Sequence, residues 1–423
     1  MHDTTALQPA VTVDTLQPDG SAHGASDRMI LGTIARIYPT ASGRLSAQAT
    51  LIQKPAEPAG AEPAALPAFV KRFYLQAAAR ELLTGERVAH CLRALIPGRL
   101  VEVCYAAAVQ RAHYAGLQVC ASVWMCPVCA AKISERRRID LHAGVTTWRG
   151  RGNMVLMASF TLSHKLGDDL QAVKALIKKA YADFRHGRKW EEIAKAIGLA
   201  GSVRSLEVTF SYENGWHPHF HVLFFLDTPL DEHSMDGILF FSALSEQFKA
   251  RWVACVERAG GWATHEHGLH LTYADNEIAE YIAKWGHEPT EPMWTAAHEL
   301  TKAVSKKGRT GGRTPLQLLA DFAENHEADA GRLYVVYVRA FKGERQLWWS
   351  QGLRALLGLD AVEQTDQEVA EERILDAVIL ASLTLRQWRI ILANDVRADL
   401  LLVASSGDVA LVRSWLADFH IFV

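Results

Sequence analysis

The sequence lacks the features that would place it at once in a broad class. It carries 45 basic and 47 acidic side chains in 423 residues, so the net charge of −2 offers no overall attraction for nucleic acid, and any basic surface must be local. No apolar run reaches the roughly 18 residues that a membrane-spanning helix needs. The N-terminus shows neither the basic nor the apolar segment of a secretory signal. We therefore expect a cytoplasmic protein without a membrane partner.

Cysteine is scarce as well, with six residues in the chain, but the cysteines are not scattered evenly. Without an export signal, reduced thiols are expected, and clustered ones indicate a metal rather than disulfides. Cys126 and Cys129 have the spacing of a metal knuckle, and Cys120 lies just before them. A structural zinc takes four ligands, and Cys91 and Cys104 both compete for the fourth place. The alternative is a set of unrelated buried thiols.

Composition divides the chain into four segments. Residues 1–67 are rich in Ala, Pro, Ser and Thr and predict a flexible leader. Residues 68–150 predict a helical, Cys-rich zinc module, and residues 151–358 mix strand and helix patterns. Residues 359–423 predict a helical C-terminal appendix. The predicted fold class is α+β.

One strand carries an unusual run of histidines. His217, His219 and His221 alternate with other residues, and residues 222–226 are wholly apolar. Alternate side chains on a strand point the same way, so the imidazoles would share one face. Residues 202–212 predict the partner strand of a hairpin. Imidazole suits several divalent metals. A metal held by only a few protein ligands keeps open coordination positions, which indicates a catalytic metal.

A later helix supplies reactive side chains. Glu277, Tyr281 and Lys284 have the i, i+4 and i+7 spacing that places them on one helix face. Taken alone, this segment is more typical of an ordinary amphipathic helix with a Glu280–Lys284 surface pair, and the strand of histidines is what favours a reactive site. A tyrosine hydroxyl titrates near 10 and needs a metal-polarised electrophile, a cation or a base to act as a nucleophile. Lys284 is the candidate cation and Glu277 the candidate base.

Three motifs, in this order along the chain, resemble those of rolling-circle plasmid replication initiators of the HUH endonuclease superfamily. They lie at residues 160–164 (FTLSH), 217–221 (HPHFH) and 281–284 (YIAK). The flanking residues 120–129 (CASVWMCPVC) and 342–347 (KGERQL) look typical of bacterial members. The resemblance covers about residues 90–358. It implies an antiparallel central sheet with helices packed on one face.

The same resemblance implies a mechanism. His219 and His221 would hold a Mg or Mn ion, with His217 as a third ligand. Tyr281 would attack one DNA strand at the plasmid double-strand origin, leaving a 5′-phosphotyrosine and a free 3′-OH that a host polymerase extends. Lys284 would steady the phosphate or lower the tyrosine pKa. Origin DNA, a host helicase and a host polymerase are the implied partners.

Several roles stay open at this point. In some members of the family a glutamate activates water, and Glu277 or Glu207 could serve here, whereas Glu280 points away on an ideal helix. Glu207 is also an alternative metal ligand. His164 either ends a strand or joins the site. A cysteine in a Cys-x-Arg context in the family favours Cys91 as the fourth zinc ligand.

One loop has the best local concentration of basic residues. These side chains could track a phosphate backbone without reading sequence, although an exposed linker would look the same. Trp285, Trp348 and Trp349 could stack unpaired bases, although packing in a core is the commoner use of tryptophan. The basic residues of the loop are Lys302, Lys306, Lys307, Arg309 and Arg313.

Two other functions remain in competition with replication initiation. A mobilisation relaxase or a single-strand transposase would use the same chemistry for strand transfer. A zinc-module DNA-binding regulator with degenerate catalytic residues would have no use for Tyr281. The flanking motifs at residues 120–129 and 342–347 favour the replication initiator.

Overall fold

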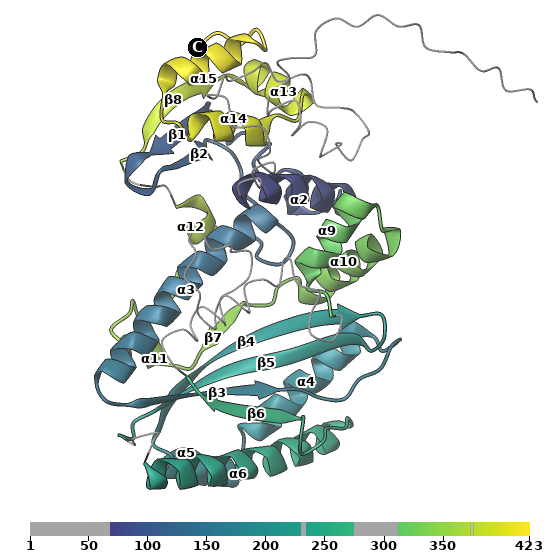
Figure 1. Cartoon of the computed structure of the whole chain (residues 1–423), viewed down its shortest axis with the longest axis vertical. Helices are drawn as coiled ribbons and strands as arrows, with labels where there is room; N and C mark the ends of the chain where they lie inside the picture. The colour runs from purple at the N-terminus through teal and green to yellow at the C-terminus, as the bar shows by residue number, and fades with distance from the viewer. Residues whose placement is uncertain (1–67, 230–233, 275–311, 373, 375) are drawn as a thin grey trace, which may run out of the picture.

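The chain folds into two parts joined by a long helix. A computed structural model describes residues 68–229, 234–274, 312–372, 374 and 376–423. In Figure 1 a small three-stranded sheet with short helices lies at one end, and a larger five-stranded sheet lies at the other. Helix α3 (Pro127–Gly150) runs between them. The fold is therefore α+β with antiparallel sheets, as the sequence predicts.

The larger sheet has the strand order β6-β3-β5-β4-β7, and every neighbouring pair is antiparallel. Its two longest strands, β4 and β5, form the hairpin that the sequence predicts, and β3 and β6 follow on the other side of β5. The strands are β3 (Met154–Phe160), β4 (Leu199–Ser211), β5 (Gly215–Leu226), β6 (Leu269–Tyr273) and β7 (Leu347–Trp349).

The β4–β5 hairpin depends on a glycine at its turn. Gly215 has a φ of +78°, which L side chains rarely adopt. A Cβ atom at this position would also lie only 2.9 Å from the carbonyl oxygen of Lys165. The resulting register sets Glu207 opposite His219 and Ser205 opposite His221. The hairpin therefore decides which side chains face the histidines.

Helices α4, α5 and α6 cover one face of this sheet (Figure 1). Phe160 from β3 stands at the centre of that interface. Its ring makes edge-to-face contacts with Tyr181, Phe184 and Trp252, at centroid separations of 5.3, 5.0 and 5.0 Å. Such aromatic pairs stabilise a core beyond the area they bury. The helices are α4 (Leu170–Phe184), α5 (Arg188–Ala196) and α6 (Met235–Ala259).

The opposite face is covered at one end, which corrects the expectation of helices on one face alone. The C-terminal half of α3 packs Val145 and Trp148 against Leu223 and Phe225 of β5. The rings of Trp148 and Phe225 lie 6.2 Å apart in an edge-to-face contact. Residues 222–226 are all buried because the strand here is covered on both faces. The histidine end of β5 lies beyond this cover.

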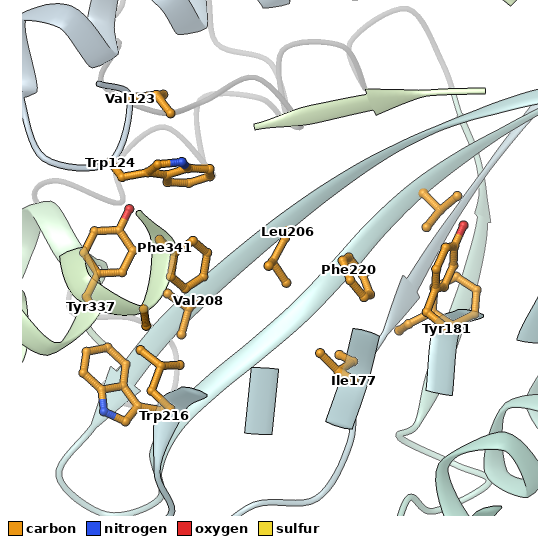
Figure 2. Close-up of a cluster of buried hydrophobic side chains, with 14 of the residues drawn as sticks. Val123, Trp124, Ile177, Tyr181, Leu206, Val208, Trp216, Phe220, Tyr337 and Phe341 are labelled. Atoms are coloured by element: carbon orange, nitrogen blue, oxygen red, sulfur yellow. The ribbon is translucent and has the colours of Figure 1, made fainter. Parts of the chain in front are cut away.

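Helices α9 (Pro315–Asn325) and α10 (Ala328–Phe341) close the hairpin end of the sheet. In Figure 2 Tyr337 and Phe341 of α10 lie beside Trp124, facing Val208 and Trp216 of the hairpin. The rings of Trp124 and Phe341 make a tilted contact with a centroid separation of 5.1 Å. One continuous core therefore links the cysteine segment to the large sheet.

The small sheet combines the two ends of the described chain. Strand β8 pairs with β1 across more than 270 residues of sequence, and β1 also pairs with β2. The expected C-terminal appendix is therefore not helical throughout, because it supplies β8. The strands are β1 (Val101–Ala106), β2 (Arg111–Ala115) and β8 (Val378–Leu383).

A second hydrophobic core lies behind the small sheet. Trp388 is fully buried there, contacts the Tyr114 ring at 5.1 Å and donates its indole N–H to the carbonyl of Arg93 at 2.8 Å. The residues 68–150 and 359–423 that the sequence separates thus share one core. The helices of this part are α2 (Ala68–Leu82), α13 (Leu385–Ala393), α14 (Arg397–Ala404) and α15 (Val409–Ala417), and the shorter elements of the chain are η1 (Arg87–Ala89), η2 (Ala107–Val109), α11 (Leu353–Leu356) and α12 (Asp366–Glu371).

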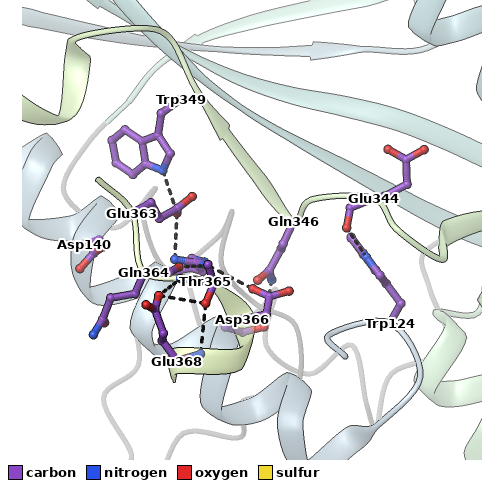
Figure 3. A network of polar contacts seen from close by, with 12 residues as sticks. Trp124, Asp140, Glu344, Gln346, Trp349, Glu363, Gln364, Thr365, Asp366 and Glu368 are labelled. Carbon is purple, nitrogen blue, oxygen red and sulfur yellow. Dashed lines mark hydrogen bonds and ion pairs between the residues drawn. The ribbon is translucent and has the colours of Figure 1, made fainter. Parts of the chain in front are cut away.

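The flanking motif at residues 342–347 is a structural joint. The carbonyl of Glu344 accepts a hydrogen bond from the indole of Trp124 at 2.7 Å (Figure 3), and the Glu344 carboxylate pairs with Lys174 at 2.9 Å. Gln346 donates to Ser134 of α3 at 2.9 Å in a buried position. Both flanking motifs therefore hold α3, α4 and α10 together rather than lining the histidine face.

Among the residues that the structure describes, no helix is both long enough and apolar enough to span a membrane.

Candidate functional site

The histidine face of the large sheet brings three metal-binding groups together. Glu207 Oε2 lies 3.6 Å from His219 Nε2 and 3.7 Å from His221 Nε2. One donor atom from each of the three residues falls within 4.8 Å of the others. The His219 and His221 side chains are 14% and 4% exposed and that of Glu207 is 23% exposed, so the group is shielded but reachable.

Hydrogen bonds set the tautomers of the two imidazoles. His219 Nδ1 lies 3.2 Å from the carbonyl oxygen of His217, which can only accept. The proton of neutral His219 is therefore on Nδ1, and the Nε2 lone pair points toward Glu207. His221 Nδ1 contacts the Ser159 hydroxyl at 2.9 Å, and with that hydroxyl as acceptor the lone pair of His221 is on Nε2. Such outer partners are typical of metal-ligating histidines.

His217 belongs to a different contact. His164 Nδ1 lies 2.9 Å from the carbonyl oxygen of Asn214, and His164 Nε2 lies 2.6 Å from His217 Nδ1. Since the carbonyl must accept from Nδ1, His164 Nε2 accepts from His217 Nδ1. Burial, followed by the neighbouring imidazoles of His219 and His164, lowers the pKa of His217 to about 3. The His217 ring is thus held neutral beside the metal-binding group.

The geometry therefore brings Glu207, and not His217, into the group of converging donor atoms. The reason is the hairpin register, which sets Glu207 directly beside His219, while His217 turns toward His164. His217 as a third ligand stays a prediction. The sequence analysis kept Glu207 only as an alternative ligand or base. It missed Ser159, which only the alternation of side chains along β3 could have placed on the histidine face.

The donor set fits a divalent metal ion. Two neutral imidazoles and one carboxylate at these separations can turn toward one ion, and together they match the ligand preferences of Mn or Zn better than those of Mg, which favours oxygen. Three protein ligands leave positions for water or substrate. A metal ion held by these three groups would therefore have open coordination positions, unlike a closed structural site.

The predicted nucleophile region lies outside the described residues. That region includes Tyr281, Lys284, Glu277 and the lower-ranked Glu280, and also Trp285. The basic residues Lys302, Lys306, Lys307 and Arg309 lie outside as well. The structure does describe the residues that flank this region along the chain, Ala274 before it and Arg313 after it. Ala274 donates to the carbonyl of Val155 at one end of the histidine face, and Arg313 forms a two-bond bridge with Phe210 near the hairpin end.

Arg313 is the one predicted DNA-binding residue within the described part of the chain. Its guanidinium contacts Glu327 at 2.8 Å and Asp321 at 2.9 Å, and it lies over the Tyr212 ring. The hydrogen bond that Arg313 donates to Glu327 raises the pKa of Arg313. The side chain therefore already ties α9 and α10 to the hairpin, and DNA contact by Arg313 stays a prediction.

The two described candidate tryptophans lie on opposite faces of the sheet. Trp349 packs in the core beneath α3 and donates to Glu363 at 3.2 Å (Figure 3). Trp348 is 38% exposed, and the guanidinium groups of Arg185 and Arg204 lie over its ring. The strand register sets Trp348 opposite Arg204, whose guanidinium lies over Phe220 on the other face of the sheet. Trp348 therefore points away from the histidine face.

Four cysteines converge where the sequence predicts a zinc module. Cys91, Cys120, Cys126 and Cys129 are buried and their sulfur atoms lie within 4.8 Å of one another, with measured contacts of 3.5, 3.6 and 3.8 Å. Sulfur atoms at the corners of a tetrahedral zinc site lie about 3.8 Å apart, given a Zn–S bond of about 2.3 Å. The donor set therefore fits a structural zinc. Cys104 lies in β1, outside this group.

The thiols are arranged to stabilise negative charge. Burial raises the pKa of Cys126, but hydrogen bonds with Cys120, Cys129 and Cys91 outweigh it, so the pKa falls well below the usual value. Gln76 of α2 also donates to Cys126 Sγ at 3.2 Å. Hydrogen bonds of this kind orient thiolate ligands.

A chain of hydrogen bonds connects the cysteine cluster, through Gln76, to Arg397 in the C-terminal segment. Arg397 of α14 is 2% exposed and donates to the Gln76 side-chain oxygen at 3.2 Å. Its positive charge lies beside a cluster that carries net negative charge once a metal is bound. Sequence reasoning gave no signal for Gln76 or Arg397, because both lie far from the cysteines along the chain.

Comparisons with known proteins agree with the family resemblance. The chain is 29% identical to "Protein rep" of Streptomyces lividans over 300 aligned residues, which cover 58% of this chain and 65% of the relative. It is also 28% identical to a "Neomycin resistance protein" of Streptomyces cyanogenus over 26% of this chain and 30% of that protein. The chain thus spans less than two thirds of the length of either relative. No family model and no solved structure matches it. The similarity to a Rep protein confirms the predicted resemblance to plasmid replication initiators.

Proposed function

We propose that this protein starts rolling-circle replication of a plasmid by nicking, and later rejoining, one strand at the double-strand origin. The observation that carries the proposal is the convergence of Glu207, His219 and His221 on one open face of the sheet. The similarity to a Rep protein supports replication as the setting.

The described residues would bind and orient a divalent ion at this face. His219 and His221 present their Nε2 lone pairs because their Nδ1 atoms are engaged elsewhere. Glu207 adds the only formal charge to the donor set. When bound, such an ion would stabilise negative charge on the oxygens of a scissile phosphate.

Tyr281 is the proposed nucleophile, and its position in the sequence is compatible with the site. Ala274 bonds to Val155, which is four residues before Ser159, the partner of His221. Four strand residues span about 13 Å. The seven residues from Ala274 to Tyr281 reach at most about 24 Å when extended. The chain is therefore long enough for the tyrosine to reach the metal-binding group.

The proposed reaction balances with the side chains named so far. The Tyr281 oxygen forms a bond to phosphorus as the bond from phosphorus to the 3′ oxygen breaks. The tyrosine proton passes to a base, for which Glu277 is the candidate, and the departing 3′ oxygen takes up a proton from water. Lys284 steadies the phosphate. The free 3′-OH is then available to a host polymerase, with a host helicase opening the duplex.

The test is a strand-specific assay on supercoiled DNA that carries the plasmid origin. With Mn²⁺ or Mg²⁺, we expect an open-circular product in which only one strand is cut, and no cut in a plasmid lacking the origin. Adding a host extract and labelled nucleotides separates replication from strand transfer. Nicking without any 3′-extension would favour a relaxase or transposase, and origin binding without metal-dependent nicking would favour a non-catalytic regulator.

A further inference from the structure

A cavity of about 570 Å³ lies beside the cysteine cluster, far from the histidine face. Its walls come from α2, from the edge strand β2 and from the first turns of α3. Cys129 lines it, and Lys132 is one helical turn further along. The volume is within the ordinary range of small-molecule binding sites.

Basic side chains from four separate segments reach this cavity. Arg72 comes from α2, Arg99 from the loop before β1, Arg111 from β2 and Lys132 from α3. Arg72, Arg111 and Lys132 also line a neighbouring hollow of about 190 Å³, so they form the boundary between the two spaces.

Acidic side chains share these spaces with the cations: Glu371 and Glu372 line the cavity, and Glu135 and Glu372 line the neighbouring hollow. Glu371 and Glu372 lie on its rim and are exposed. Lys132 donates to the main-chain carbonyl oxygens of Ala370 and Glu372, which carry no net charge. Burial is the main cause that lowers the pKa of Lys132, which is half-buried. Arg111 is exposed and Lys132 is half-buried, so an anion that enters the cavity can reach both cations and form charge-assisted hydrogen bonds with them.

The floor of the cavity is aromatic and apolar. Phe69, Phe73 and Tyr114 line it, and the rings of Phe73 and Tyr114 make an edge-to-face contact at 6.4 Å. The Tyr114 hydroxyl donates to the carbonyl of Arg397 at 2.7 Å, which fixes the position of the ring. Flat apolar groups such as nucleobases bind to surfaces of this kind.

We propose that this cavity binds one unpaired nucleotide of single-stranded DNA. The base lies on the Phe69, Phe73 and Tyr114 floor, and its phosphate contacts Arg111 and Lys132 at the boundary of the two hollows. The base must be unpaired and unstacked to lie on these rings, because the faces of a base in a duplex are covered by its stacked neighbours. The nucleotide chemistry follows from the cavity itself, and only its source, the opened origin, rests on the proposed function.

The experiment measures binding of a fluorescent oligothymidine by anisotropy, with the full chain carrying Tyr281→Phe so that no nicking intervenes. Arg111→Gln removes one cation, and Ala115→Trp fills the cavity without a charge change. Arg188→Gln is the matched control, because the Arg188 side chain is 90% exposed on α5. We expect roughly tenfold weaker binding for Arg111→Gln, as for the loss of one charge-assisted contact. Ala115→Trp should weaken binding similarly, and Arg188→Gln should leave it unchanged.

A second readout locates the nucleotide directly. A strand with 5-iodouracil in place of one thymine should photocross-link within the segments that hold Phe69, Phe73 and Tyr114. Cross-links confined to other segments, or unchanged binding in both cavity variants, would overturn the proposal. So would competition by an acidic peptide as strong as that by the strand. If free thymidylate binds as tightly as the strand, the cavity is a site for a free nucleotide and not for a nucleotide of single-stranded DNA.

This outcome is separable from that of the proposed function. Loss of strand binding in the cavity variants with intact origin nicking would place the cavity outside the nicking step. Absence of nicking in the parent chain, with the cavity still binding the strand, would overturn the nickase and leave the cavity assignment in place.

Discussion

Replacing Glu207 with glutamine tests the metal-binding group at its only charged member. Glu207 Oε2 lies 3.6 and 3.7 Å from the two imidazole Nε2 atoms, so the substitution keeps the shape of the group and removes its formal charge. Changes in the outer partners of metal ligands already lower affinity by about 10- to 100-fold. We expect the loss of a direct ligand charge to reach at least the upper end, about 100-fold.

The 100-fold loss of Mn²⁺ affinity can be converted into a change in the Mn²⁺-induced rise in Tm. At a Mn²⁺ concentration about 100 times the dissociation constant, binding stabilises the native chain by about 2.7 kcal/mol. A 100-fold weaker site at the same concentration contributes only about 0.4 kcal/mol. For a domain of this size the Mn²⁺-induced rise in Tm should fall from roughly 5–10 °C to about 1 °C.

The assay is calorimetric unfolding with and without Mn²⁺, alongside titration of Mn²⁺ into the protein. Glu213→Gln is the matched control, because Glu213 is an exposed residue in the turn of the same hairpin. The Tm without metal should be the same in all three proteins. Undiminished Mn²⁺ affinity in Glu207→Gln, or an equal loss in Glu213→Gln, would refute the assignment of Glu207 as a ligand.

Three further predictions follow from other parts of the structure. Cys91→Ser should lower the zinc content measured by metal analysis by one ion per chain, whereas Cys104→Ser should leave it unchanged, and equal zinc contents in the two variants would contradict the cluster. Phe225→Ala should lower the free energy of unfolding by about 3–5 kcal/mol in a denaturant titration, since it empties the core beneath α3, and a loss below about 1 kcal/mol would show that α3 does not cover that face. Ser159→Ala should weaken Mn²⁺ binding about tenfold without changing Tm in the absence of metal, because His221 loses its Nδ1 partner, and unchanged affinity would exclude that role.

Local patterns predicted much of the histidine face. Alternation along residues 217–221 is enough to place three imidazoles on one face of a strand, and the Gly215 turn predicts the hairpin. The choice between Glu207 and His217 was not accessible in the same way. It depends on the strand register and on the contact with His164, which lies more than 50 residues away.

Long-range pairing escaped sequence reasoning for a related reason. Strand β8 is short, and its partner β1 lies near the other end of the described chain, so no local signal joins them. The uniform burial of residues 222–226 was visible as an apolar run. The covering helix α3 was not, since its contacts with Leu223 and Phe225 arise only from the tertiary fold.

The most direct measurement is the identity of the residue that becomes joined to DNA. The wild-type protein is incubated with Mn²⁺ and an origin oligonucleotide, digested, and examined by mass spectrometry for a peptide bearing a 5′-phosphate-linked nucleotide. We predict a single adduct on Tyr281, absent in Tyr281→Phe and strongly reduced in Glu207→Gln. An adduct on another residue, or nicked DNA with no covalent protein adduct at any time, would contradict the proposed mechanism.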